Sequence, residues 1–168
     1  MSTKIYTGNK VNQGRLIHDS GPDIKIYPIL KFPDPILSAR AEEVTVFDED
    51  LMNLIGDMWA TLNSMKWGRA VGLAAPQIGK SIQLFIAEGA VYINPKVTWV
   101  TKAPKQVQRE GCYSGIVNDF KDVHRYTSIR MNWVDQHGKP HSGRFNGFKA
   151  RVIQHELDHL NIDWENGL

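Results

Sequence analysis

The stretch QHELDHL at residues 154–160, close to the end of the 168-residue chain, carries the pattern H-E-x-x-H. Residues four apart lie on one face of a helix, so His155 and His159 can bind one divalent metal ion together. Glu156 then lies within reach of a water on that ion and can take its proton. The stretch therefore predicts a C-terminal helix that supports metal-assisted hydrolysis. The alternative is an ordinary helix with two histidines and a glutamate on its surface.

A catalytic metal site of this type normally has three protein ligands, so one more is expected. Downstream, Asp163 lies about 12 Å from His155 along a continuous helix, which is too far for one ion to bind both with ease. Glu165 could bind the ion only if the helix ended early. We therefore expect the third ligand upstream of the helix.

The upstream candidates are one thiol and four imidazoles, at Cys112, His18, His124, His137 and His141. His18 lies in a segment without periodicity, and His137 and His141 lie in a predicted hairpin that faces solvent. His124 remains an alternative. Cys112 is favoured because it follows a predicted strand and because a thiolate completes a Cys/His/His ligand set.

Residues 48–65 predict an amphipathic helix in the first half of the chain. Asp48 is a typical N-cap residue, and apolar side chains recur after it with helical spacing and form one broad face. Gly68 is expected to end the helical region. The apolar residues are Leu51, Leu54, Ile55, Met58, Trp59, Leu62 and Met65.

The remaining pattern consists of short apolar runs separated by turn signals, which predict strands. Residues 31–37 and 114–123 are expected to be irregular, and residues 70–79 to form a tightly packed turn. The order of elements predicts an α+β fold, with antiparallel or mixed sheets packed around a C-terminal metal-binding helix from about Phe148 to Leu160. The expected strands are 81–87, 91–100 with a break at Asn94-Pro95, 106–112, 127–134 and 141–145.

Length and composition predict one catalytic domain over residues 25–168, preceded by an extension over residues 1–24. The formal net charge of +2 argues against direct binding of nucleic acid, and no apolar run is long enough for a membrane span. A single cysteine excludes an intrachain disulfide and favours a reducing compartment. We expect a cytoplasmic monomer. Because residues 1–18 contain no acid, an organellar matrix or stroma is the alternative location.

Three motifs in this chain resemble those of the peptide deformylases, and they occur in the same order. Residues 70–77 (AVGLAAPQ) resemble the first motif of that family, residues 110–114 (EGCYS) the second, and residues 154–160 the third. The segment FPDPIL at residues 32–37 is similar to the family's opening segment. The resemblance extends over roughly residues 28–160.

The resemblance implies a metal-dependent hydrolase that removes the N-formyl group from nascent peptides beginning with formyl-methionine. It implies one metal ion per chain, natively Fe²⁺ and replaceable by Zn²⁺, Ni²⁺ or Co²⁺. The implied ligands are Cys112, His155 and His159. Glu156 would act as general base and then as general acid.

For the remaining site residues, the resemblance implies that Gln77 and the backbone N–H of Tyr113 stabilise the oxyanion. Val71 and Gly72 would bind the substrate backbone. Val152, with Ile153 beside it, is expected to line the pocket for the methionine side chain. Tyr113 is also expected to border this side chain.

One supporting contact and several departures from the family pattern are also apparent. Glu110 is expected to pair with Arg125 behind the metal ligands. Ala70 replaces a glycine of the first motif, Tyr113 replaces a leucine, and Ile116 replaces a proline. The chain ends soon after the third motif, without the longer C-terminal element that contacts the ribosome in some members. Ribosome contact would then be transient.

Two other functions remain open from the sequence. One is a metallopeptidase of another kind, which would cleave internal peptide bonds and would not need Cys112. The other is a non-catalytic deformylase-like protein that binds peptide N-termini, which the departures at Ala70, Tyr113 and Ile116 would allow.

Overall fold

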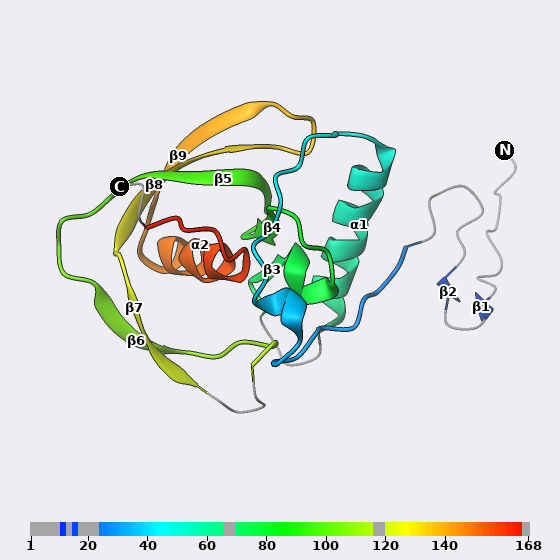
Figure 1. Cartoon of the computed structure of the whole chain (residues 1–168), viewed down its shortest axis with the longest axis horizontal. Helices are drawn as coiled ribbons and strands as arrows, with labels where there is room; N and C mark the ends of the chain where they lie inside the picture. The colour runs from blue at the N-terminus through cyan, green and yellow to red at the C-terminus, as the bar shows by residue number, and fades with distance from the viewer. Residues whose placement is uncertain (1–10, 13–14, 17–23, 66–69, 116–119, 166–168) are drawn as a thin grey trace, which may run out of the picture.

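A five-stranded antiparallel sheet in the order β3-β4-β5-β8-β9 forms the frame of the molecule (Figure 1). The computed structural model describes residues 24–65, 70–115 and 120–165, together with the backbone of residues 11–12 and 15–16. The strands are β3 (Gly72–Ala74), β4 (Leu84–Ala87), β5 (Ala90–Val100), β8 (Ser128–Val134) and β9 (Pro140–Asn146).

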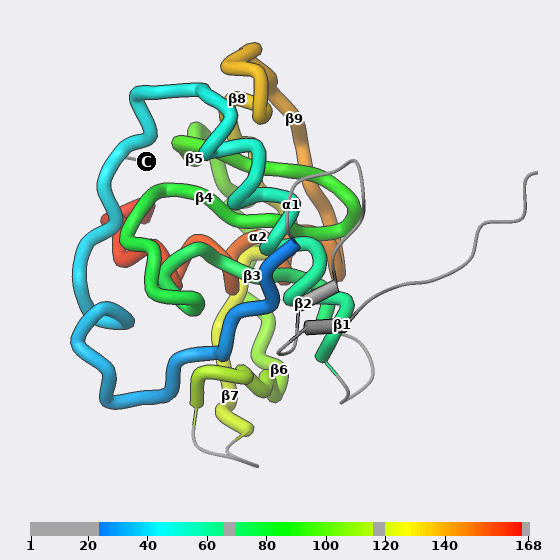
Figure 2. The backbone as a smooth tube through the Cα atoms, turned by 90° about the vertical axis from the view of Figure 1, so that its right-hand side faces the viewer, coloured from blue at the N-terminus to red at the C-terminus, as the bar shows by residue number. Residues whose placement is uncertain are grey.

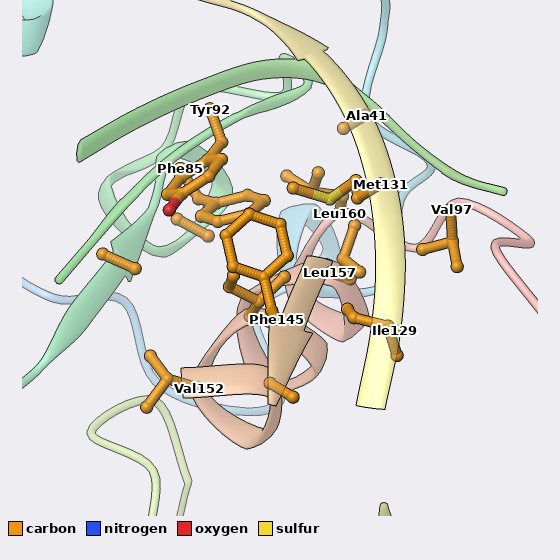
Figure 3. Close-up of a cluster of buried hydrophobic side chains, with 14 residues drawn as sticks. Ala41, Phe85, Tyr92, Val97, Ile129, Met131, Phe145, Val152, Leu157 and Leu160 are labelled. Atoms are coloured by element: carbon orange, nitrogen blue, oxygen red, sulfur yellow. The ribbon is translucent and has the colours of Figure 1, made fainter. Parts of the chain in front are cut away.

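The C-terminal helix α2 (Gly147–His159) packs on one face of this sheet, over β3, β4, β8 and β9. Ile153 and Leu157 of this helix, and Leu160 directly after it, are fully buried in a cluster with residues from the strands. Figure 3 shows Leu157 and Leu160 in this cluster beside Met131, Ile129 and Phe145. Burial of these apolar side chains fixes the position of the helix that carries both histidines.

Helix α2 ends at His159 because the chain turns sharply after Leu160. Asn161 takes the left-handed conformation (φ 49°) that often follows a helix C-terminus. Its side-chain amide donates hydrogen bonds to the carbonyl oxygens of Leu37 (2.8 Å) and Ala39 (3.1 Å). Asp163 and Glu165 therefore do not continue the helix face of the two histidines.

Helix α1 (Glu49–Ser64) packs beside β3 and β4, as Figure 1 shows. The Asp48 side chain accepts a hydrogen bond from Leu51 N at 3.0 Å, so the predicted N-cap is confirmed. The apolar face of α1 buries Leu51, Ile55, Met58 and Leu62 against strand residues of a second core cluster.

Two short strand pairs lie outside the main sheet. Strands β6 (Gln106–Glu110) and β7 (Lys121–Arg125) form an antiparallel pair on the far side of α2 from β5 (Figure 1). Strands β1 (Val11–Asn12) and β2 (Arg15–Leu16) also pair. Figure 2 shows residues 24–48, blue to cyan, running around the edge of the molecule before α1.

Two 3₁₀ turns flank the functional region. They are η1 (Pro35–Leu37), capped by the Asp34 side chain, and η2 (Ala75–Ile78), which follows β3 directly. None of the helices in the described parts of the chain is long and apolar enough to cross a membrane.

The predicted α+β class with antiparallel sheets is confirmed, but four local predictions were wrong. Residues 72–74 form a strand, not only a turn, and residues 35–37 form a 3₁₀ turn. Strand β7 begins inside the segment expected to be irregular. Strand β5 runs through Asn94-Pro95 unbroken, because a register shift between Ile93 and Lys96 absorbs the proline. Gly68 and Ile116 lie outside the described residues.

Candidate active site

Cys112, His155 and His159 come together at the end of β6 and along α2. The imidazoles lie one helical turn apart, with ring centroids separated by 5.0 Å. Cys112 Sγ lies 3.2 Å from His159 Nε2. One potential ligand atom from each of the three residues lies within 4.8 Å of the others, and all three side chains are half-buried. A single ion can therefore be bound by all three residues.

Electrostatics favours a thiolate at this position. Burial raises the pKa of the Cys112 thiol, but hydrogen bonds with His155 and His159 outweigh burial and lower it to about 5. Burial alone would lower the pKa of His155, whereas hydrogen bonds with Cys112 and Glu110 raise it to about 10. Since a thiolate is the form of cysteine that binds metals, the pocket holds this ligand in the required state.

Glu110, the last residue of β6, is the centre of a buried charge cluster behind His155. Its carboxylate accepts a hydrogen bond from His155 Nδ1 at 3.1 Å and from Arg125 Nη2 at 2.9 Å. Arg151 Nη1 donates to the same carboxylate. Arg125 also pairs with Asp158 at 2.5 Å. Burial raises the pKa of Glu110, but the bonds from His155, Arg125 and Arg151 lower it to about 2, so it stays ionised. Because Glu110 occupies His155 Nδ1, Nε2 is the ring nitrogen that can bind an ion beside Cys112.

Glu156 lies buried against the backbone of Gly72 in β3. A Cβ atom at Gly72 would lie 2.7 Å from Glu156 Cδ, which no side chain would tolerate without a shift. Glu156 Oε2 is buried and has no hydrogen-bond partner among the described residues. Burial raises the pKa of this carboxyl, while His155 and His159 oppose the rise. A carboxylate in this environment can accept and return a proton.

Gln77, in the 3₁₀ turn η2, is held with its amide nitrogen toward the thiol. Its Oε1 accepts a hydrogen bond from Ala74 N at 2.9 Å, which fixes the orientation of the amide. Its Nε2 lies 3.7 Å from Cys112 Sγ and 3.2 Å from Ser114 Oγ. Leu30 N donates to Gln77 O and Phe32 N to Ser114 O, so residues 30–32 connect the two loops.

Cys112, His155, Glu156 and Gln77 line one cleft of about 280 Å³, and His159 lies next to Cys112 behind the lining residues. Val71, Gly72, Tyr113 and Val152 also contribute to its walls, and their role in binding substrate stays a prediction. Its other lining residues are Ala70, Gln108, Arg109, Glu110, Gly111, Phe148 and Arg151. Ile153 is instead fully buried in the core cluster, so the expectation that it helps line the pocket was wrong.

The chemistry of the site fits a bound divalent ion. One soft thiolate and two imidazoles are a suitable donor set for Fe²⁺, Zn²⁺, Ni²⁺ or Co²⁺. Glu110 orients one imidazole from behind, as in other histidine-ligated metal sites. The unpartnered Glu156 oxygen lies in the same cleft and can accept a hydrogen bond from a water at the ion.

The other described candidates lie elsewhere, and His18 is outside the described residues. His124 is exposed on β7, and His137 lies in an exposed turn. His141 is half-buried, stacks on Trp133 and bonds to Asp135 at 2.8 Å. Glu165 forms an ion pair with Lys105 at 2.8 Å.

Sequence reasoning missed Ser114, Arg151 and Asp158. Arg151 lies one helical turn before His155, so the spacing 151, 155, 159 could have placed it on the ligand face. Ser114 and Asp158 lie inside the recognised motifs, but their partners Gln77 and Arg125 come from distant segments. Those contacts could not be read from local sequence.

Comparison with known proteins agrees with this geometry. The sequence model of the polypeptide deformylase family matches residues 26–162. The chain belongs to the peptide deformylase family. This membership makes it a metal-dependent hydrolase of N-terminal protein processing and confirms the resemblance inferred from the three motifs.

Individual deformylases are similar over most of their length. A curated peptide deformylase of Desulfotalea psychrophila is 38% identical over 146 residues, which cover 81% of this chain and 83% of the relative. The crystal structure of the Thermotoga maritima peptide deformylase is 36% identical, with a TM-score of 0.76 and coverage of 81% and 92%. The Plasmodium falciparum deformylase, solved with an inhibitor, is 34% identical, with a TM-score of 0.74 and coverage of 80% and 83%.

Proposed function

We propose that this protein removes the N-formyl group from nascent peptides that begin with formyl-methionine. The observation that carries the proposal is that three convergent ligand atoms lie at one cleft beside a buried carboxylate oxygen that has no partner among the described residues. Cys112, His155 and His159 would hold the metal. When bound, the metal supplies a Lewis acid and an acidified water.

Residues of the chain would carry out the proton transfers and stabilise the oxyanion. Glu156 takes a proton from the attacking water and returns it to the leaving nitrogen, which its raised pKa favours. Gln77 Nε2 and the backbone N–H of Tyr113 donate hydrogen bonds to the oxygen of the formyl carbon as negative charge develops there. Because Ala74 fixes the Gln77 amide, this donor is oriented before the substrate arrives.

The cleft walls suit a short N-terminal segment. Val71 and Gly72 would form hydrogen bonds with the substrate backbone, and Val152 would contact the methionine side chain together with Tyr113. The close packing of Glu156 on Gly72 leaves little room beside the base, which favours a small acyl group such as formyl.

We further propose Fe²⁺ as the native metal, because a thiolate with two imidazoles suits a divalent transition metal; Zn²⁺, Ni²⁺ or Co²⁺ would substitute.

The proposed catalytic domain spans residues 25–168, with residues 1–24 as an extension. The protein would act as a monomer in the cytoplasm or in an organellar matrix or stroma, with transient contact to the ribosome.

The test is product analysis with metal-loaded protein. Protein loaded anaerobically with Fe²⁺, or with Ni²⁺, is incubated with a formyl-Met peptide, because an iron-bound thiolate is prone to oxidation. We expect formate and an otherwise intact peptide, and activity should require Cys112. Cleavage of internal bonds would indicate another metallopeptidase. Peptide binding without formate release at full metal occupancy would indicate a non-catalytic relative.

A further inference from the structure

The outer part of the main sheet exposes a basic surface on the face opposite α2. Strands β5, β8 and β9 contain no aspartate or glutamate. Their inward residues Val97, Met131 and Phe145 are buried under α2. The alternating residues Lys96, Arg130 and Arg144 are exposed on the opposite face.

Two of these cations lie directly opposite each other on neighbouring strands. Arg130 of β8 pairs in register with Arg144 of β9. Like charges at such a position destabilise a sheet, and among the described residues neither guanidinium forms an ion pair with a carboxylate. By contrast, the buried Arg125 and Arg151 and the half-buried Lys105 all pair with acids. The arginine pair thus costs stability and gains no compensating ion pair within the described chain.

A bulge in β5 adds an aromatic side chain to the same surface. The register with β8 shifts between Val97 and Trp99, so Trp99 is brought opposite Arg130 and is 39% exposed. A β-bulge changes the direction in which the side chains next to it point. The guanidinium of Arg144 lies 5.0 Å from the centroid of the Trp99 ring. The exposed residues between the cations, Thr98, Asn132 and Ser142, are polar.

No described helix covers this surface, because α1 packs on β3 and β4. The chain's acids are concentrated elsewhere, since residues 42–57 contain six acidic residues and no lysine or arginine. A net charge of +2, which argued against a nucleic-acid partner, therefore conceals separate acidic and basic regions.

We propose that this surface, defined by Lys96, Trp99, Arg130 and Arg144, binds RNA. The three cations would contact phosphates, and Trp99 would stack on an unpaired base. The polar side chains between the cations suit hydrogen bonds to ribose and phosphate better than insertion into lipid. The catalytic cleft is lined by α2, β3 and β6, so the proposed surface on the opposite face leaves it open. This inference does not depend on the proposed enzymatic function.

The test is the fluorescence anisotropy of a labelled RNA stem-loop titrated with the full-length, metal-loaded protein at several salt concentrations. We expect saturable binding at about 50 mM salt, with an affinity that falls as salt rises.

The double variant Arg130→Gln/Arg144→Gln should weaken binding at least tenfold at this salt. It should also reduce the slope of log K against log salt by about 1.5, since each phosphate contact contributes about 0.7–0.9. Trp99→Ala should weaken binding about fivefold or more without changing the slope.

The matched control is Arg40→Gln/Lys80→Gln, which removes the same charge from two exposed residues outside the surface. Both double variants should release formate from a short formyl-Met peptide at the wild-type rate. The proposal is overturned if wild-type protein does not bind the RNA at low salt, or if the two double variants lose equal affinity. Binding to anionic lipid vesicles through Arg130 and Arg144, with no binding to RNA, would also overturn it.

Discussion

At the scale of single residues, Gly72 and Glu156 constrain each other. A methyl group at residue 72 would lie 2.7 Å from Glu156 Cδ, so the carboxylate would have to move. We predict that Gly72→Ala lowers kcat/KM about 100-fold, because a displacement of about 1 Å at a reacting group costs that much. Formate release at equal metal content measures the effect.

Gly56→Ala on α1 is the control, since its Cβ would meet nothing within 4 Å. The control should keep full activity and gain about 0.5–1 kcal/mol in stability.

Gln77 carries a second residue-scale prediction. Gln77→Leu removes the donor proposed for the oxyanion, so kcat should fall 10²–10³-fold, or about 2.7–4 kcal/mol. The variant also leaves Ala74 N without its acceptor and should lose stability. Gln83→Leu is the matched control, because Gln83 is also buried and its side-chain amide donates to Ala41 O at 3.2 Å. If Gln77→Leu and Gln83→Leu lower kcat equally, the loss follows from lower stability and Gln77 has only a structural role.

The residues of the site differ in how far sequence could predict them. His155, Glu156 and His159 follow from one local pattern, because helical spacing fixes their relative positions. The choice between Cys112 and His124 could not be decided by spacing, since it depends on how the β6–β7 pair lies against α2. Arg151 and Asp158 needed the fold for the same reason, because their partners lie on β6 and β7.

At the scale of elements, helices were easier to predict than strands. Helix α1 could be predicted from the N-cap residue Asp48 and a long apolar face. Strand β3 could not, because it has only three residues, all small or apolar. Strand β7 (Lys121–Arg125) is mostly polar and exposed, so it lacks the alternation that marks a half-buried strand. Its pairing with β6 comes from tertiary context.

The β8–β9 hairpin provides a pH prediction at this scale. A hydrogen bond from His141, supported by Lys139 N and His137 N, lowers the pKa of Asp135 from 3.8 to about 2. The folded state therefore binds this proton less readily than the unfolded state. The stabilisation is complete above about pH 5 and is lost as the pH falls through about 2.

Thermal unfolding of wild type and Asp135→Asn from pH 7 to pH 2.5 measures this contribution. The difference in Tm should be constant above pH 5 and should shrink below pH 4, because the asparagine does not titrate. Asn132→Ser, at an exposed residue of β8, is the control and should show a pH-independent difference, because neither side chain titrates. A constant Asp135→Asn difference down to pH 2.5 would contradict the assignment.

At the scale of the whole molecule, a metal ion would join two separate parts of the fold. Cys112 follows β6, whereas His155 and His159 belong to the helix that packs on the main sheet. Free metal at about 100 times its Kd should stabilise the protein by about 2.7 kcal/mol. The corresponding increase in Tm is roughly 5–10 °C for a chain of this size. Differential scanning fluorimetry with and without a chelator measures it. Cys112→Ala should abolish most of the increase, and an equal increase in that variant would exclude Cys112 as a ligand.

Formate release by wild type and by Glu156→Gln, measured at equal metal occupancy, decides whether the protein is a deformylase that uses Glu156 as its proton carrier. Glu156 is the proposed proton carrier and is not a ligand, so the variant should keep its metal. We predict that wild type releases formate from a formyl-Met peptide and that the variant does so at a rate about 10²–10⁴-fold lower. Wild-type protein that carries one metal ion and releases no formate would contradict the account, as would a fully metallated Glu156→Gln variant with the wild-type rate.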